Sequence, residues 1–144
     1  MDQANYTSFS RDDFTELRSV QSSQPVHMLN LIKLRAEAIY EDGCKTTGLE
    51  AYTHYGRVSF PVFTRLGGTI VWRGQLDQIL IGPKQEAWDI CFVAQYQSAA
   101  AFVEMVLDPV YRRAMRHRQA AVENSRLIRL SSAATGNAFH GAML

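Results

Sequence analysis

The sequence predicts a single α+β domain in which two helices cover one face of an antiparallel sheet. Three observations lead to this fold class. The stretches 26–34 and 88–96 carry apolar residues at both alternating sets of positions, an amphipathic helical stretch follows each of them, and a shorter apolar stretch at 125–131 closes the domain. A chain of 144 residues, 47% of them hydrophobic, buries about two-thirds of its surface on folding. One ordinary core is therefore expected.

The N-terminal segment, residues 1–24, is predicted to form a short helix and a polar link. Ser10 is a typical N-cap residue, and Asp12 and Asp13 place negative charge in the first turn, where the helix dipole favours it. The helix should reach about Val20.

The next two elements are a strand at 26–34 and a long helix. Apolar residues on both faces of the strand indicate that both faces are covered. Thr47 and Glu50 have the spacing of a capping box, so the helix should begin after Thr47. Gly67 and Gly68 should end it.

The middle of the chain predicts a second and a third strand. Residues 69–72 and 78–81 are rich in β-forming residues around Gly74, which predicts either one bent strand or two short ones. The strand at 88–96 follows the Gly82-Pro83 turn.

The last part of the domain begins with a helix in two pieces. Ser98 should cap the first piece and Asp108, followed by a proline, the second, which should continue to about Glu123. The final strand is expected at 125–131, and residues 133–144 form a C-terminal tail.

Residues 25–132 thus have the order β-α-β-β-α-β, which is the ferredoxin-like arrangement. Both helices must then cover the same face of the sheet. Because the first and third strands are apolar on both sides, the second face should pack against a second copy of the chain. We therefore expect a symmetric homodimer with its sheets face to face, forming a dimeric α/β barrel.

A series of short motifs resembles a known family. In chain order they include Met28-Leu29-Asn30-Leu31, Gly48-Leu49-Glu50-Ala51-Tyr52, Gly67-Gly68, Ile81-Gly82-Pro83, Asp108-Pro109 with Tyr111, His117-Arg118 and Ser125-Arg126-Leu127. Over roughly residues 26–131 the chain resembles the domain-of-unknown-function 1330 family of the dimeric α/β-barrel superfamily, although Gln97 stands where members usually have proline. The resemblance implies a homodimer and a pocket between sheet and helices. It implies no reaction, since related members range from cofactor-free monooxygenases to lactone isomerases and haem-dependent peroxidases.

Three residues are candidates for catalysis. Asn30 is an amide in a buried strand, where it either satisfies a neighbouring backbone group or donates to a bound carbonyl or oxyanion. Arg118 lies on the inward stripe of its helix, where it either pairs with Asp89 or anchors a substrate carboxylate or enolate. His117 is a candidate general base, with a partly exposed surface histidine as the alternative.

The candidate substrate-binding residues are Tyr52, Trp88, Asp89 and Tyr111. The aromatic members could line a pocket for a planar ligand or simply belong to the core.

Composition excludes several classes of function. A net charge of +1 argues against a general nucleic-acid or membrane-surface binder. The four histidines and two cysteines lack the spacing of a metal or redox site, so neither metal nor cofactor is expected. A polar, acidic N-terminus is unlike a signal peptide, which favours a cytoplasmic protein. The chain contains no apolar run of the length that a membrane span requires.

The sequence therefore predicts a small homodimer that binds an apolar carbonyl or phenolic metabolite without metal or nucleotide and that is a candidate to transform it. The alternative is a non-catalytic dimeric module that binds a metabolite or haem. An RNA-binding domain is disfavoured, because residues 89–96 lack the usual aromatic spacing and the chain lacks a basic surplus. Catalysis itself stays open at this level.

Overall fold

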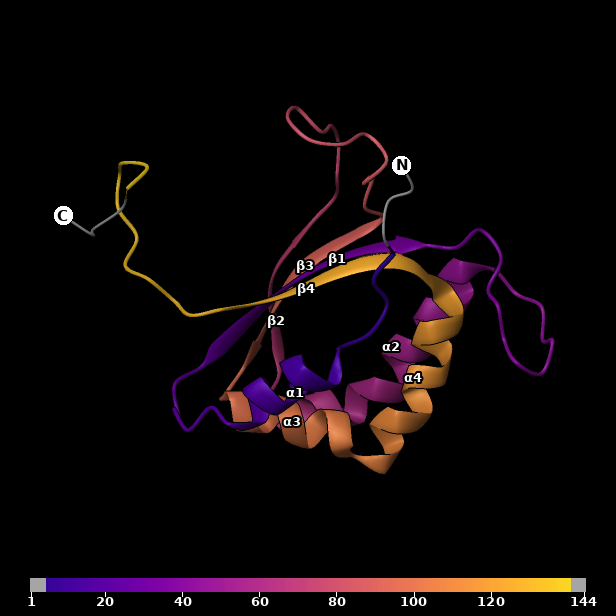
Figure 1. Cartoon of the computed structure of the whole chain (residues 1–144), viewed down its shortest axis with the longest axis horizontal. Coiled ribbons are helices and arrows are strands. Elements are labelled where there is room, and N and C mark those ends of the chain that lie inside the picture. Colours follow the sequence, from indigo (N-terminus) through magenta and orange to yellow (C-terminus); the bar gives the residue numbers. More distant parts are fainter. Residues whose placement is uncertain (1–4, 141–144) are drawn as a thin grey trace.

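A computed structural model of the chain describes residues 5–140, which form one antiparallel sheet with helices on one side (Figure 1). The elements are α1 (Arg11–Arg18), β1 (Val26–Leu34), α2 (Gly48–Arg65), β2 (Thr69–Gly74), β3 (Ile90–Tyr96), α3 (Ala99–Leu107), α4 (Pro109–Ala121) and β4 (Val122–Leu130). Residues 1–4 of the predicted N-terminal segment and 141–144 of the predicted tail lie outside the described residues.

The sheet has the strand order β2-β3-β1-β4, with every neighbouring pair antiparallel. The helices α1 to α4 lie together on one face, and the other face is open (Figure 1). This arrangement confirms the ferredoxin-like fold and the extra N-terminal helix. It places β1 at the centre of the sheet, between β3 and β4.

Local hydrogen bonds explain why the helices begin where the sequence indicates. The side chains of Ser10, Thr47 and Ser98 accept from backbone N–H groups of Asp13, Glu50 and Ala101 at 3.0, 3.0 and 3.1 Å. Asp108 caps α4 in the same way, accepting from Val110 at 2.7 Å. Each cap satisfies an N–H that has no partner within its helix.

Three predictions about the strands are wrong. The strand predicted at 88–96 begins at Ile90. Residues 78–81 form no strand: they belong to a loop over 75–89, with Leu80 and Ile81 81% and 98% exposed. The pairing of β2 with β3 ends at Gly74 and Cys91, so this stretch has no strand to pair with. The last strand begins at residue 122 instead of 125, directly after α4, because Val122 still pairs with Leu34 of β1.

The core lies between the sheet and the helices. On β1 the alternate residues Val26, Met28 and Ile32 are buried against the helices. Val26 and Met28 pack with Ala94 and Tyr96 of β3 and with residues of α2, α3 and α4. Ile32 belongs to a second cluster, with residues of α2 and α4.

The open face of the sheet carries one apolar residue from each strand in a single register row. Leu29 pairs with Val93 and with Ile128, and Val93 pairs with Trp72. Trp72 and Ile128 are 58% and 43% exposed. We call these four residues the apolar row.

Candidate functional site

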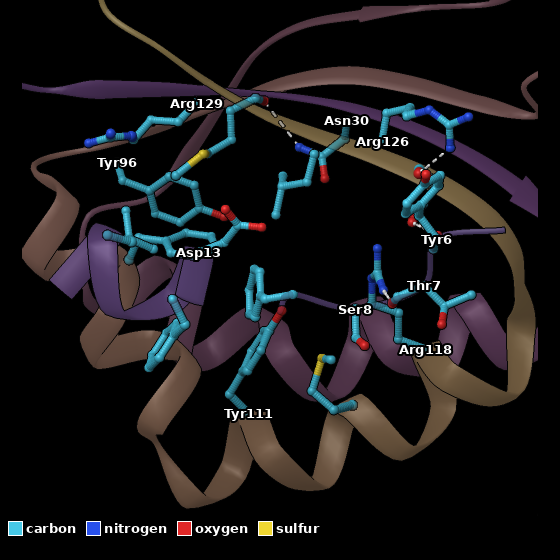
Figure 2. Close-up of a pocket in the computed structure, with 18 of the residues that line it drawn as sticks. Tyr6, Thr7, Ser8, Asp13, Asn30, Tyr96, Tyr111, Arg118, Arg126 and Arg129 are labelled. Atoms are coloured by element: carbon cyan, nitrogen blue, oxygen red, sulfur yellow. Dashed lines mark hydrogen bonds between the residues drawn. The ribbon is translucent and has the colours of Figure 1, made fainter. Parts of the chain in front are cut away.

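A cavity of about 410 Å³ lies between the helix-covered face of the sheet and the helices (Figure 2). The sheet contributes chiefly Met28, Asn30, Tyr96 and Leu127, and the helices chiefly Tyr55, Phe102, Tyr111, Met115 and Arg118. Residues 6–9 and α1 line it as well. Just over half of the lining residues are aromatic or aliphatic, and the rest are polar or charged. Apolar surface combined with polar groups that orient a ligand is typical of small-molecule sites.

The N-terminal segment is held across this cavity by three hydrogen bonds. Tyr6 N donates to Asn124 Oδ1 at 2.9 Å, and Ser125 Oγ donates to the carbonyl oxygen of Tyr6 at 2.7 Å. Arg118 Nη1 donates to the carbonyl oxygen of Thr7 at 2.7 Å. These bonds join residues more than 110 positions apart. They fix residues 6 and 7 in place as part of the cavity wall.

Two tyrosines form a hydrogen-bonded pair in the wall. The hydroxyl oxygens of Tyr55 and Tyr111 are 2.7 Å apart. Burial raises the pKa of both phenols, although the positive charge of Arg118 opposes this shift. Both are therefore protonated at neutral pH. Their mutual bond uses one of the two hydroxyl protons and leaves the other for a further acceptor.

Asn30 both satisfies a backbone group and faces the cavity. Its Nδ2 donates to the carbonyl oxygen of Met28 at 3.1 Å, as the structural interpretation of this amide expects. Its side chain points from β1 toward the cavity (Figure 2). The register pairs Asn30 with Leu127 and Phe92 on the same face of the sheet.

The expected ion pair between Asp89 and Arg118 is wrong. Asp89 lies just before β3, where its Oδ2 accepts from the backbone N–H of Leu34 at 2.8 Å. Arg118 points from α4 toward the N-terminal segment instead (Figure 2). The partner of Arg118 is therefore the backbone carbonyl of Thr7, more than 100 residues away in the chain. The sequence predicts a carboxylate in this place.

His117 lies outside the cavity, although its neighbour Arg118 lines it. The Nδ1 atom of His117 is 2.6 Å from the hydroxyl of Tyr40, and its ring stacks on that of His54 with centroids 5.4 Å apart. Successive residues of a helix point about 100° apart, which separates these two side chains. Its role as a general base stays a prediction.

The structure thus brings together three of the seven candidate residues, Asn30, Tyr111 and Arg118, at the cavity. Tyr52 packs behind the wall against Tyr55, with ring centroids 5.2 Å apart. Trp88 stacks on the guanidinium of Arg126 at 5.2 Å, and neither Trp88 nor Asp89 lines the cavity.

Sequence reasoning left out Tyr55, Tyr96 and the N-terminal segment. Tyr55 follows Tyr52 by three residues on one helical stripe, and that spacing could have placed it at the site. Nothing in the sequence of residues 6–9 indicates that they cover a cavity.

The environment of His117 predicts a pH dependence of stability. Burial, followed by the charge of Arg116 and the ring of His54, lowers the pKa of His117 below its ordinary value of 6.5. The unfolded chain then binds a proton at His117 more readily than the folded chain does. The free energy of unfolding should therefore decrease as the pH falls from the ordinary pKa of 6.5 toward the lowered pKa of the folded state. His117→Asn should flatten this loss in urea denaturation curves at pH 5 to 7.5. Gln119→Asn, exposed on the same helix, is the control, and equal slopes for the wild type and His117→Asn would contradict the expectation.

Within residues 5–140, no three His, Cys, Asp or Glu side chains are grouped closely enough to hold a metal ion. In the same range, no helix is both long and apolar enough to cross a membrane. Cys44 and Cys91 are free.

Comparisons with known proteins agree on the fold. The family model described as domain of unknown function 1330 matches residues 43–130. A crystal structure of RPA0582, a protein of unknown function from Rhodopseudomonas palustris, is 54% identical, with a TM-score of 0.87 over 90% of this chain and 98% of that one. A crystal structure of the methylated RPA0582 protein is 52% identical, with a TM-score of 0.91 over 94% of this chain and 100% of that one. No curated protein matches.

Proposed function

Since the chain belongs to the family described as domain of unknown function 1330, which names no reaction, we propose from the cavity that the protein binds a small apolar carbonyl or phenolic metabolite. The observation that carries the proposal is the cavity of about 410 Å³ between sheet and helices. Its volume lies in the range of small-molecule sites.

The chemistry of the wall supports this class of ligand. Aromatic rings from β3, α3 and α4 supply flat apolar surface, through Tyr96, Phe102 and Tyr111. The Tyr55–Tyr111 pair and Asn30 add neutral hydrogen-bonding groups that suit a carbonyl or phenol oxygen. Transformation of the ligand in this cavity would proceed without metal or nucleotide.

One observation favours the second candidate function, a non-catalytic binding module. His117, the candidate general base, lies outside the cavity and is hydrogen-bonded to Tyr40. The described residues that line the cavity include no histidine. Ligand binding without turnover supports the binding module, whereas conversion of the bound compound supports the enzyme.

The proposed unit is a homodimer that packs through the open face of the sheet. The apolar row supports it, because Leu29, Val93, Trp72 and Ile128 run across all four strands with no helix over them. A contiguous apolar patch of this kind is typical of an interaction surface. A two-fold axis would place the same row of both copies in contact.

A thermal-shift screen tests ligand binding. A panel of small aromatic and aliphatic carbonyl and phenolic compounds should contain one that raises the melting temperature by about 5–10 °C at 100 times its dissociation constant. Met115→Trp places a larger side chain in the cavity wall and should abolish that shift.

The matched control is Gln119→Trp, which adds the same side chain at an exposed position of the same helix and should keep the shift. A shift that survives Met115→Trp would place the ligand elsewhere and count against the proposed site.

A further inference from the structure

Resting on the proposed function, we propose that the ligand of this cavity is a compact aromatic or aliphatic acid whose carboxylate binds to Arg118. An acid of this kind keeps the compact apolar body of the proposed ligand and adds a negative charge at its polar end. Three features of the cavity lead to it: the unused donors of Arg118, the balance of donors and acceptors in the wall, and the position of the other charges.

Arg118 has more donors than the protein satisfies. A guanidinium carries five N–H groups, and among the described residues Arg118 makes one side-chain hydrogen bond, to the carbonyl oxygen of Thr7. None of the four ion pairs within residues 5–140 includes it. The side chain is only half-exposed, so its positive charge lacks both a carboxylate partner and full hydration. Such a charge is costly unless a counter-ion arrives.

Two further polar groups of the wall offer unused hydrogen-bond donors to the cavity. The Tyr55–Tyr111 pair keeps one hydroxyl proton unused, and Asn30 Nδ2 keeps one N–H after its bond to Met28. The charge of Arg118 acts on both phenols, since it opposes the rise in their pKa. A group rich in acceptors and negative in charge complements this set, and a carboxylate is both.

The other charges of the wall include two carboxylates of α1, Asp13 and Glu16. Asp13 lies beside Tyr96, on the opposite side of the cavity from Arg118 (Figure 2), and neither carboxylate forms an ion pair with Arg118. Arg126 is bound to Glu86 at 2.7 Å, so it competes less for a ligand anion. Arg129 lies near Tyr96 as well (Figure 2). Arg118 is therefore the cation best placed to bind the carboxylate.

The geometry fits an acid with a flat or aliphatic body. The planar guanidinium binds both oxygens of a carboxylate side by side, and the Thr7 carbonyl uses only Nη1. The acid can therefore bind while the N-terminal segment stays in place. The body would lie against the rings of Tyr96, Phe102 and Tyr111, which line the same cavity.

A matched pair of probes tests the charge. 2-Naphthoate and 2-naphthamide share the same flat ring system. The first carries a charged carboxylate where the second carries a neutral amide. Isothermal titration of the full chain should show about tenfold tighter binding of the acid. Arg118→Gln should bring the two probes to equal affinity, and Arg118→Lys, which keeps the charge without the planar fork, should retain part of the preference. Arg113→Gln, exposed on the same helix, should keep all of it.

The outcomes separate this inference from the proposed function. If the wild type binds the acid and the amide with equal affinity, the proposal of a carboxylate ligand is wrong. The proposal that the cavity binds a small molecule is then unaffected. An acid preference that survives Arg118→Gln overturns the assignment to Arg118. Failure of both probes to bind at millimolar concentration overturns this inference, and the proposed function fails only if its own ligand screen is negative as well. If Arg118→Gln does not fold, the ratio of the acid and amide affinities is compared between the wild type and Arg118→Lys instead. An unchanged ratio in Arg118→Lys would then count against the role of Arg118.

Discussion

Replacing Gly48 with alanine is expected to destabilise the protein by about 3 kcal/mol, as forced overpacking against rigid atoms does. Gly48 is the first residue of α2 and is buried where the helix approaches the end of β1. A Cβ there would lie 1.9 Å from the carbonyl oxygen of Arg35 and 2.9 Å from its carbonyl carbon. Both atoms belong to the backbone, so the clash is relieved only by moving the helix or the strand. Gly48 N also donates to the carbonyl oxygen of Ala36 at 3.3 Å, which ties the two segments together.

Gly56 provides the matched control in the same helix. A Cβ at Gly56 would meet no atom within 4 Å, and alanine has a higher helix propensity than glycine. Gly56→Ala should therefore stabilise the protein by about 0.5–1 kcal/mol. Urea denaturation at one fixed protein concentration measures both changes, since association would make stability depend on concentration. If both substitutions changed the free energy of unfolding by similarly small amounts, the contact between α2 and the end of β1 would not be rigid, and the expectation would be wrong.

Ile128→Lys is expected to convert the proposed homodimer into monomers at micromolar concentration. Ile128 is the β4 member of the apolar row and is 43% exposed in the single chain. In a face-to-face dimer each copy would bury a lysine against an apolar sheet. Burying an unpaired charge is strongly unfavourable, whereas the same lysine on a monomer is solvated. The monomer fold should therefore survive.

Light scattering coupled to size exclusion measures this change. Phe60→Lys is the control, because Phe60 is 61% exposed on α2, on the helical side of the molecule. It should leave the molar mass at that of the wild type. A monomeric wild type, or a dimer that Ile128→Lys leaves intact, would contradict association through the apolar row.

Much of the fold could be predicted because its signals are local. Ser10, Thr47, Ser98 and Asp108 each cap a helix through bonds to residues two or three positions ahead. The two-sided apolar pattern of β1 identified a strand whose second face is not polar. In the structure, Leu29 and Leu31 on that face are only half-buried by the single chain.

The candidate site was predicted only in part, because its members come from distant parts of the chain. Asn30, Tyr111 and Arg118 were found from their positions on inward-facing stripes. The identity of the partner of Arg118 was missed, since a charge on a stripe reveals a need for a partner and not which segment supplies it. Residues 78–81 show the same limit: their β-forming residues have no neighbouring strand to bond.

The sequence by itself determined the order of elements, most helix starts and the two-sided strands of this protein. Periodicity and caps act over a few residues, so they are readable without the fold. Only the tertiary structure decided that Tyr6 and Thr7 close the cavity, that His117 turns away from it, and that Arg118 keeps free donors inside it. Those contacts join residues up to 119 positions apart, and only packing decides which of the many possible distant partners meet.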